Sequence, residues 1–267
     1  MKSQQIPDNI LQGKWSTITK QERQTRIDLA ACHRLADLNG FSDIVWNHIS
    51  ARVPGYDDRF LINLFGLRFD EVTASNLVTL DGNCNVVTPP MSADGEALET
   101  GEMNFTGFVI HSAIYEHRSD VNCVMHSHSR AGLAVSALEQ GFIPMVQDAF
   151  QFYNRVSYHD YEGLSLDLDE RERLAASLGD NPVMIMRNHG LMTTGATVAQ
   201  AYVRMHYLEL SCRNQMDVLS TGAKVQLPSE EVCEHAAMQY EKSAPAGTYE
   251  WDALVRKLDS IDPSYCS

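Results

Sequence analysis

The sequence predicts an α/β protein in which helices cover a mixed β-sheet. Short apolar runs bounded by turn residues alternate with longer segments whose apolar residues recur every three or four positions. The first pattern is typical of strands and the second of amphipathic helices. Two pairs of runs are separated by only a few turn residues, which indicates hairpins and therefore antiparallel strands. The 267 residues, 44% of them hydrophobic, suffice for one large core, so we expect one domain with a tail.

The first half of the chain begins with a helix. Apolar residues such as Ile27 and Leu35 recur at helical spacing, and Asn39-Gly40 ends the pattern. The Pro54-Gly55 turn separates two strand-like runs, and Asp81-Gly82-Asn83 separates two more. In order, the sequence predicts a helix over 19–38, strands over 44–53, 59–64, 77–80 and 86–87, and a helix over 104–117.

The second half continues this alternation of strands and helices. The predicted elements are a strand over 121–128, helices over 130–138 and 167–177, a strand over 182–190, a helix over 198–219, and two weaker helical patterns on either side of Pro245-Ala246-Gly247. Gly222 ends the long helix. We therefore expect a lead-in over 1–18, an α/β domain over 19–222 and a helical tail over 223–267.

The composition argues against several kinds of partner. A formal charge of −14 and a pI near 5.0 oppose binding to a nucleic acid or an anionic membrane. The N-terminal segment lacks the apolar core of a signal peptide, and no apolar stretch approaches the roughly 18 residues of a membrane-spanning helix. The six cysteines are scattered without C-x-x-C spacing, which favours reduced thiols. We expect a cytoplasmic protein that acts on a small molecule.

Histidines end two of the predicted apolar strands. His126 and His128 close the run 121–128, and side chains two apart on a strand point the same way, so both imidazoles can face one cation. His189 ends the run that starts at 182. If the two strand ends are neighbours, three histidines with an open coordination position form a catalytic type of metal site. The alternative is that these are surface or core histidines satisfied by hydrogen bonds.

Several short motifs follow one another in a set order: Asn47-His48-Ile49-Ser50-Ala51-Arg52, Phe65-Gly66, His111, the His126/His128 pair, and Asn188-His189-Gly190. In this order they resemble the class II aldolase/adducin family, over most of the chain. The resemblance implies a three-layer α/β/α sandwich with a mostly antiparallel central sheet, and a homotetramer with active sites between subunits. It also implies a divalent metal ion held by His126, His128 and His189. Zinc is the expected ion, with iron, manganese or cobalt as alternatives.

The residues that serve sugar-phosphate chemistry in that family differ in this sequence. By position, the family's acid/base glutamate corresponds to Gly107, its phosphate-binding asparagine to His48, and its small hydroxyl residues to Phe65 and to Phe105-Thr106. Phenyl rings cannot donate the hydrogen bonds that a buried phosphate dianion needs. We therefore expect a substrate without phosphate, whose apolar or aromatic part contacts Phe65, Gly66, Phe105 and Thr106. The alternative for the two phenylalanines is an ordinary place in the core.

Four further residues are candidates for catalysis. His48 and Arg52 could hold a substrate carboxylate, since arginine binds a carboxylate through two parallel hydrogen bonds. The alternative for Arg52 is that it anchors the edge of the sheet. His111 is expected behind a metal ligand rather than as a ligand itself. His159, in what reads as a polar loop, could replace the missing glutamate, with a solvated loop as the alternative.

Three functions remain open from the sequence. The first is a metal-dependent lyase that cleaves a C–C bond, by aldol cleavage or decarboxylation, in a non-phosphorylated carbonyl compound bearing a carboxylate. The second is a mononuclear iron oxygenase that uses the same histidines. The third is an adducin-like interaction protein without catalysis. The sequence names neither the substrate nor the metal, nor the role of the tail.

Overall fold

The computed structural model describes residues 18–92 and 96–267, so all but the last residue of the predicted lead-in lies outside the described residues. The described chain forms an eight-stranded sheet in the order β4-β3-β2-β1-β5-β8-β7-β6. Neighbouring strands are antiparallel except β6 and β7, which are parallel. The strands are β1 (His48–Arg52), β2 (Arg59–Ile62), β3 (Val78–Asp81), β4 (Val86–Thr88), β5 (Cys123–Ser127), β6 (Val156–His159), β7 (Val183–Met186) and β8 (Gly190–Gly195).

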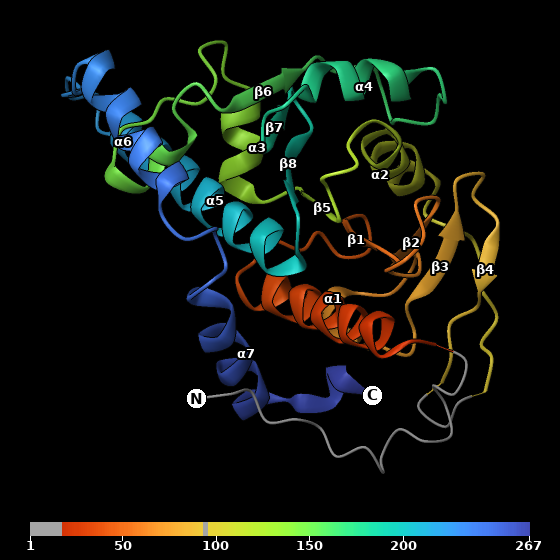
Figure 1. Ribbon diagram of the computed structural model, residues 1–267. Coiled ribbons are helices and arrows are strands. Elements are labelled where there is room, and N and C mark those ends of the chain that lie inside the picture. The colour runs from red at the N-terminus through yellow and green to blue at the C-terminus, as the bar shows by residue number, and fades with distance from the viewer. Residues whose placement is uncertain (1–17, 93–95) are drawn as a thin grey trace.

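Helices cover both faces of this sheet (Figure 1). One hydrophobic cluster joins the sheet to α1, α3, α5 and α7, and a second cluster on the opposite face joins it to α2 and α4. The prediction of a three-layer α/β/α sandwich with a mostly antiparallel central sheet is confirmed. The helices are α1 (Lys20–Leu38), α2 (Phe105–His117), α3 (Arg130–Ser136), α4 (Glu170–Leu178), α5 (Val198–Ser220), α6 (Glu230–Lys242) and α7 (Glu250–Ile261), with 3₁₀ helices η2 (Phe69–Glu71), η3 (Gln147–Phe152) and η4 (Pro263–Cys266).

Successive side chains along a central strand point to opposite faces of the sheet, so each one packs against one of the two helix layers. Ile49 on β1 and Met125 on β5 pack into the cluster that includes α1 and α5, whereas Val124 packs with α2. Residues two apart share a face, so His126 follows Val124 toward the α2 layer. His48 is the register partner of His126. Both histidines therefore lie between the sheet and α2.

The structure differs from the prediction at the start of β1 and in two strands that were not predicted, β6 and β8. The strand predicted from residue 44 begins only at His48, because Ile44 has a φ of +47° and lies in a turn that Trp46 N closes on Asp43 O. The sequence analysis also missed β6, whose four residues carry too short an apolar signal to stand out from a loop. This second difference changes the interpretation of His159 below.

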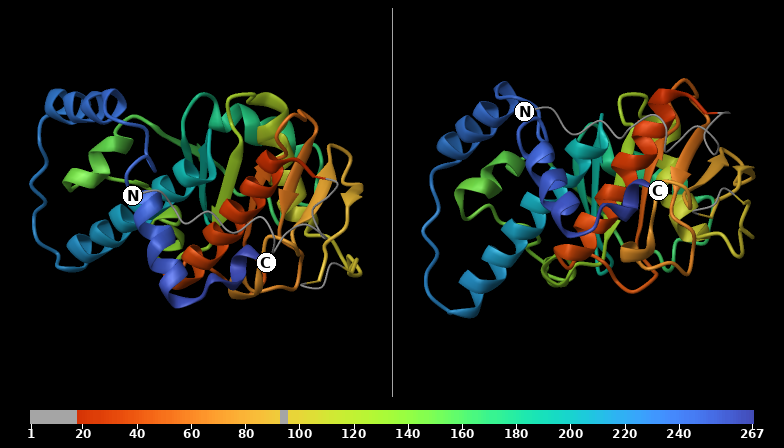
Figure 2. Two further views of the ribbon diagram at one scale, coloured as in Figure 1. Left: turned by 60° about the horizontal axis from the view of Figure 1, so that its bottom comes forward. Right: turned by 90° about the horizontal axis from the view of Figure 1, so that it is seen from below.

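The tail beyond Gly222 contains α6 and α7, as its two helical patterns predict. An exposed segment, 221–230, projects from the body of the molecule after α5 (Figure 2). α6 then packs on η3, where Arg155 pairs with Glu234 at 2.7 Å and with Glu241 at 2.9 Å. The division into lead-in, domain and tail stays a prediction. Among the helices of the described residues, none is both long and apolar enough to cross a lipid bilayer.

Buried His33 ties α1 to the sheet. Its Nδ1 lies 2.7 Å from the Leu29 carbonyl oxygen, and its Nε2 lies 3.2 Å from Asn63 Oδ1. The same Asn63 oxygen accepts a hydrogen bond from Ile49 N at 3.3 Å, so one amide joins α1 to β1. Burial lowers the pKa of His33 to about 4.

This lowered pKa predicts a loss of stability in mild acid. Above pH 6.5 His33 is neutral in both the folded and the unfolded chain. Between pH 6.5 and about 4 the unfolded chain binds a proton that the folded chain does not, so the free energy of unfolding decreases as the pH falls. In metal-free protein, His33→Gln should reduce that slope by up to about 1.4 kcal/mol per pH unit, measured by urea unfolding. The exposed His235→Gln is the control; equal slopes in wild type and His33→Gln would contradict this account.

Candidate metal centre

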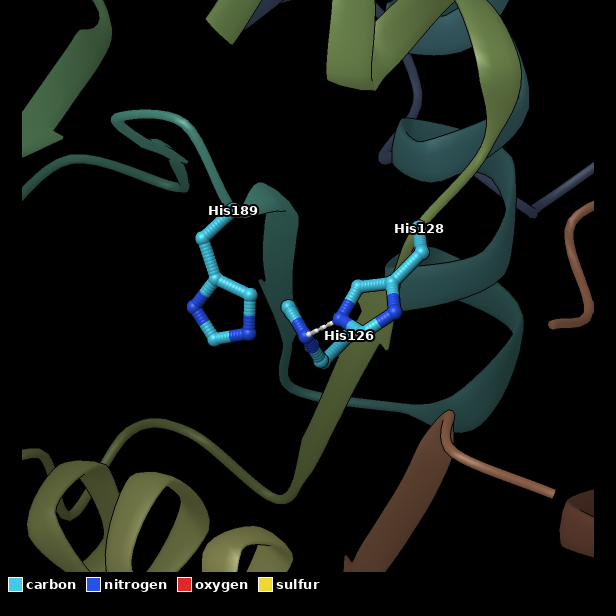
Figure 3. A group of neighbouring side chains, drawn as sticks. All are labelled: His126, His128 and His189. Carbon is cyan, nitrogen blue, oxygen red and sulfur yellow. Dashed lines mark hydrogen bonds between the residues drawn. The ribbon is translucent and has the colours of Figure 1, made fainter. Parts of the chain in front are cut away.

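Three histidine rings converge at one end of the sheet (Figure 3). His126 is on β5, His128 follows that strand directly, and His189 lies in the turn between β7 and β8. Because β8 pairs with β5, with Leu191 opposite Ser127, this turn reaches the end of β5. The ring centroids are 4.7 to 5.1 Å apart, and one nitrogen from each ring lies within 4.8 Å of the others. The three predicted ligands are thus placed to hold one metal ion.

Two acceptors fix the orientation of His126 and His128. Nδ1 of His126 lies 3.0 Å from the Leu191 carbonyl oxygen, and Nδ1 of His128 lies 3.0 Å from Oδ2 of Asp43. Carbonyl and carboxylate oxygens accept, so both Nδ1 atoms carry the proton and donate it. The two Nε2 atoms, 2.9 Å apart, then face each other with their lone pairs. Metal-binding histidines are oriented in this way by partners of the second ring nitrogen.

The facing lone pairs repel each other unless a positive group lies between them. One proton can be shared between two ring nitrogens, but His189 adds a third ring nitrogen to the group. Burial lowers the pKa of His189 to about 4 and holds the pKa of His126 well below its usual range, so both rings are neutral at pH 7. A divalent cation can accept three neutral imidazoles at once. This set of donors therefore fits a metal ion with a coordination position left open.

Two features hold the histidine-bearing segments together. A Cβ at Gly190, which has a φ of +150°, would lie 2.5 Å from the Ser127 carbonyl oxygen, so glycine is required for the β7–β8 turn to approach β5. On the other side, the buried carboxylate of Glu209 on α5 accepts a hydrogen bond from Gly132 N at 2.9 Å. Glu209 thereby fixes the start of α3, which follows His128 closely.

A column of buried polar side chains leads from the metal ligands into the α2 layer. The His48 ring stacks on His126 with centroids 5.0 Å apart. His48 Nδ1 lies 2.8 Å from His111 Nε2, His111 Nδ1 contacts the Ser50 hydroxyl, and that hydroxyl lies 2.8 Å from the Tyr115 hydroxyl. Burial lowers the pKa of His48 well below its usual range and that of His111 to about 3. His48 thus contacts a candidate metal ligand, and His111 contacts the far side of His48.

Gly107 makes room for the His48 ring. A Cβ at position 107 would lie 2.9 Å from both Cγ and Cδ2 of that ring. The backbone of Gly107 is fixed, because its N–H donates to Asn104 Oδ1, the N-cap of α2, at 2.9 Å. Any side chain at this position would meet the imidazole. The two departures from the family pattern at positions 48 and 107 are therefore sterically linked.

Arg52 is not brought to the metal centre. It ends β1 on the side opposite His48, and its Nη2 donates to the carbonyl oxygens of Tyr115 and Arg118, 2.9 and 3.3 Å away. Its guanidinium also lies over the Tyr115 ring, 4.8 Å from the centroid. These contacts use the donors of Arg52 on the backbone at the end of α2, and a role of Arg52 in holding a substrate carboxylate stays a prediction. The alternative, an anchor at the edge of β1, is what the structure shows.

His159 lies beyond His189, in a setting that the sequence analysis did not foresee. It ends β6 rather than lying in a solvated loop, and it is buried, with Nδ1 3.0 Å from the Ser177 hydroxyl. Its Nε2 lies 3.5 Å from Glu170 Oε1 and has no hydrogen-bond partner among the described residues. His159 and His189 line one small pocket together with Tyr161.

The four residues expected to contact the substrate lie in two places. Phe65 follows β2 and packs on Trp46, with ring centroids 5.3 Å apart, and Gly66 turns the chain with a φ of +90°. Phe105 begins α2 with its ring partly exposed, and the Thr106 hydroxyl donates to the N-cap side chain of that helix at 2.9 Å. Contact of these four with a substrate stays a prediction. The sequence analysis did not single out Trp46.

Comparison with known proteins assigns the chain to a family. The family model for the class II aldolase and adducin N-terminal domain matches residues 27–216. The chain belongs to the class II aldolase and adducin family. The crystal structure of an aldolase II superfamily protein from Pseudomonas syringae is similar over 94% of this chain and 98% of that chain, with 43% identity and a TM-score of 0.86. The L-fuculose 1-phosphate aldolase from Glaciozyma antarctica PI12 is similar over 92% of both chains, with 25% identity and a TM-score of 0.78.

Adducins are also among the relatives. Alpha-adducin of Rattus norvegicus is 37% identical over 270 residues, which are 96% of this chain and 36% of the adducin. The chain thus spans about a third of the length of that relative. Both branches of the family are therefore represented among proteins similar to this one, and the family that the motifs resemble is confirmed.

Removal of the Asp43 carboxylate should weaken metal binding. Asp43→Ala leaves Nδ1 of His128 without its acceptor, so the ring can turn and its Nε2 is no longer directed at the centre. We expect the dissociation constant for Zn²⁺, measured by competition with a chromogenic chelator, to rise about 10- to 100-fold. Asp58→Ala, at a carboxylate that is 71% exposed, is the control and should bind as the wild type does. An unchanged constant in Asp43→Ala would contradict the orientation argument.

The steric link between Gly107 and His48 can be measured with a double-mutant cycle. Gly107→Ala in the wild-type background inserts a Cβ into the His48 ring and should destabilise the metal-free protein by about 1–3 kcal/mol. In the His48→Ala background the same change should be neutral or stabilising, because alanine favours a helix over glycine by up to about 1 kcal/mol. Urea unfolding gives the four free energies. The same effect of Gly107→Ala in both backgrounds would show that the ring does not occupy this space.

Proposed function

We propose that the protein is a metal-dependent lyase that cleaves a C–C bond in a small carbonyl compound bearing a carboxylate but no phosphate. The observation that supports this best is the pair of facing Nε2 atoms of His126 and His128 with His189 beside them. His126, His128 and His189 would hold a divalent cation there, and the cation would supply Lewis-acid stabilisation of negative charge that develops on the substrate oxygens. Zinc is the expected ion, because it accepts three histidines and leaves one position open.

The surroundings of the centre support a substrate without phosphate. Arg52 is bound to backbone carbonyl oxygens away from the site. Arg187 lines the pocket at His189 but donates to the Leu138 carbonyl oxygen at 2.7 Å and lies over the Tyr158 ring. The same pocket is lined by three carboxylates, those of Asp160, Glu162 and Glu170. A phosphate dianion would meet these negative groups without a free arginine to compensate them.

His159 is the group that we propose exchanges a proton with the substrate. Its Nε2 is buried and unpartnered within the described part of the chain, and His159 lines the same small pocket as His189. Ser177 at Nδ1 and the buried Glu170 beside Nε2 restrict the rotation of the ring. In an aldol cleavage, Nε2 accepts the proton of the substrate hydroxyl as the C–C bond breaks, and returns a proton to the carbon that receives the electron pair. His159 thereby takes the role for which Gly107 has no side chain.

His48 and His111 serve the site differently. His48 stacks on His126 and is itself held by His111, so the pair keeps the ring of this ligand in place and forms the wall on the α2 side. We propose that Phe65 and the partly exposed Phe105 contact the substrate. A cytoplasmic homotetramer, with sites completed between subunits, is part of the same proposal.

An adducin-like binding function is the alternative that one observation favours, the 37% identity to rat alpha-adducin. A protein that only binds a partner has no need of a metal ion at the three histidines. His126→Ala would then leave its function untouched. The arrangement of Asp43 and Leu191 around the ligand rings favours the enzyme, because a site without a metal has no use for two facing imidazole lone pairs.

A turnover assay tests the proposal. Zinc-loaded protein is incubated under argon with hydroxy acids, keto acids and sugar phosphates, and loss of substrate is followed by NMR. We expect cleavage of a non-phosphorylated acid, abolished in His126→Ala and reduced about 10²- to 10⁴-fold in His159→Gln, with the exposed His235→Ala as an unaffected control.

Three results would count against this function. Efficient turnover of a sugar phosphate but not of the free sugar would contradict the absence of phosphate from the substrate. Turnover that needs both iron and dioxygen would favour the oxygenase. No turnover by fully loaded protein would favour the binding function.

A further inference from the structure

Two large apolar side chains are exposed beside the metal centre. Ile44 is 70% exposed and Trp46 is 54% exposed, although the turn that carries them also carries Asp43, the partner of His128. Large apolar side chains are mostly buried in folded proteins, so exposure of two of them at a candidate active site calls for a ligand or a partner.

The turn from Asp43 to Trp46 is strained. Ile44 has a φ of +47°, a region that β-branched residues seldom adopt. Trp46 N closes the turn by donating to Asp43 O at 2.9 Å. The turn brings the Asp43 carboxylate into contact with Nδ1 of His128 and leaves the Trp46 indole at the surface. Strain of this kind persists where the surrounding structure requires it, often at functional sites.

Trp46 is paired with a second aromatic ring. Its ring centroid lies 5.3 Å from that of Phe65, at an angle of 58° between the planes. Trp46 comes from the segment before β1 and Phe65 from the segment after β2, so the pair joins two neighbouring strands of the sheet. Within the described part of the chain, the Trp46 indole N–H donates no hydrogen bond. The pair therefore offers an apolar surface with one donor available for a ligand.

The turn that carries Trp46 adjoins the three histidines, because Asp43 Oδ2 in that turn lies 3.0 Å from His128 Nδ1. Trp46 precedes His48 by two residues, so their Cα atoms are about 7 Å apart at the rise of an extended chain. His48 stacks on His126. Trp46 is thus linked to the three histidines both through Asp43 in its own turn and through His48 on β1.

We propose that Trp46 and Phe65 form the surface that binds the apolar, planar part of the substrate, and that the substrate is an aryl-substituted keto or hydroxy acid rather than a polyol. The assignment rests on the proposed function, because it takes the three histidines as the place where the carboxylate and carbonyl oxygens bind. Trp46 is then a specificity residue. It favours substrates by their apolar group without taking part in bond cleavage.

Binding of two keto acids tests this proposal. Phenylpyruvate and pyruvate share the keto acid and differ by the phenyl group. Zinc-loaded protein containing 5-fluorotryptophan is titrated with each of them and followed by ¹⁹F NMR, with the resonance of Trp46 assigned from Trp46→Phe. We expect phenylpyruvate to shift the Trp46 resonance and to leave that of Trp251 on α7 unchanged. Pyruvate should shift neither.

Calorimetry with variants gives the second readout. Trp46→Ala should raise the dissociation constant of phenylpyruvate about tenfold and leave that of pyruvate unchanged, as expected when one aromatic contact is lost. Tyr249→Ala, at a ring that is 78% exposed on the N-cap of α7, is the matched control. Trp46→Ala should also keep the wild-type content of zinc, since it removes no ligand.

Several outcomes would overturn the proposal. Equal effects of Trp46→Ala on both keto acids, or no effect on either, would show that the indole does not contact the phenyl group. A Trp46 resonance that changes with protein concentration and not with phenylpyruvate would assign this surface to contact between copies of the chain. If the protein is active in the turnover assay but Trp46→Ala does not change its preference for phenylpyruvate over pyruvate, this inference alone is refuted. If phenylpyruvate shifts the Trp46 resonance but the protein is inactive, the proposed reaction alone is refuted.

Discussion

The candidate site depends on one electrostatic constraint, the two imidazole lone pairs that face each other between His126 and His128. The Leu191 carbonyl and the Asp43 carboxylate fix both rings with Nδ1 outward, so the two Nε2 atoms face each other 2.9 Å apart. The pairing of β5 with β8 then adds His189 as a third donor. An arrangement of this kind is unfavourable in an empty site and favourable around a cation. The Gly190 turn and the Glu209 carboxylate on α5 both serve to hold it.

Beside the three histidines, the side chains at positions 48 and 107 fit one another sterically. The His48 ring stacks on His126 and occupies the space into which a side chain at Gly107 would project. A glutamate at position 107 and the His48 imidazole would therefore compete for the same space. Arg52, a candidate for holding a substrate carboxylate, binds the backbone at the end of α2. The scaffold thus retains the geometry of a metal site while the groups that would recognise a sugar phosphate are replaced by imidazole and aromatic rings.

The sequence predicted the features that depend on a local residue pattern, and it did not reveal those that depend on contacts between residues far apart in the chain. The ligand histidines could be found because two-residue spacing on an apolar strand and a second histidine after another such strand are visible in a short window. Asp43 could not, because it lies 85 residues from the histidine that it orients. His159 was read as part of a polar loop, since β6 gains its stability from pairing with β7 and not from its own four residues. The role of Arg52 likewise follows from where α2 ends in space, which no spacing in the sequence reveals.

The metal content of the protein, measured by elemental analysis after purification without chelator and without air, tests the central claim most directly. The account predicts close to one divalent ion per chain in the wild type, none in His126→Ala, and an unchanged content in the exposed control His235→Ala. Zinc, manganese or cobalt would agree with a lyase, and iron would favour an oxygenase at the same centre. A well-folded wild-type protein that holds no ion, even after incubation with each of these metals, would contradict the account.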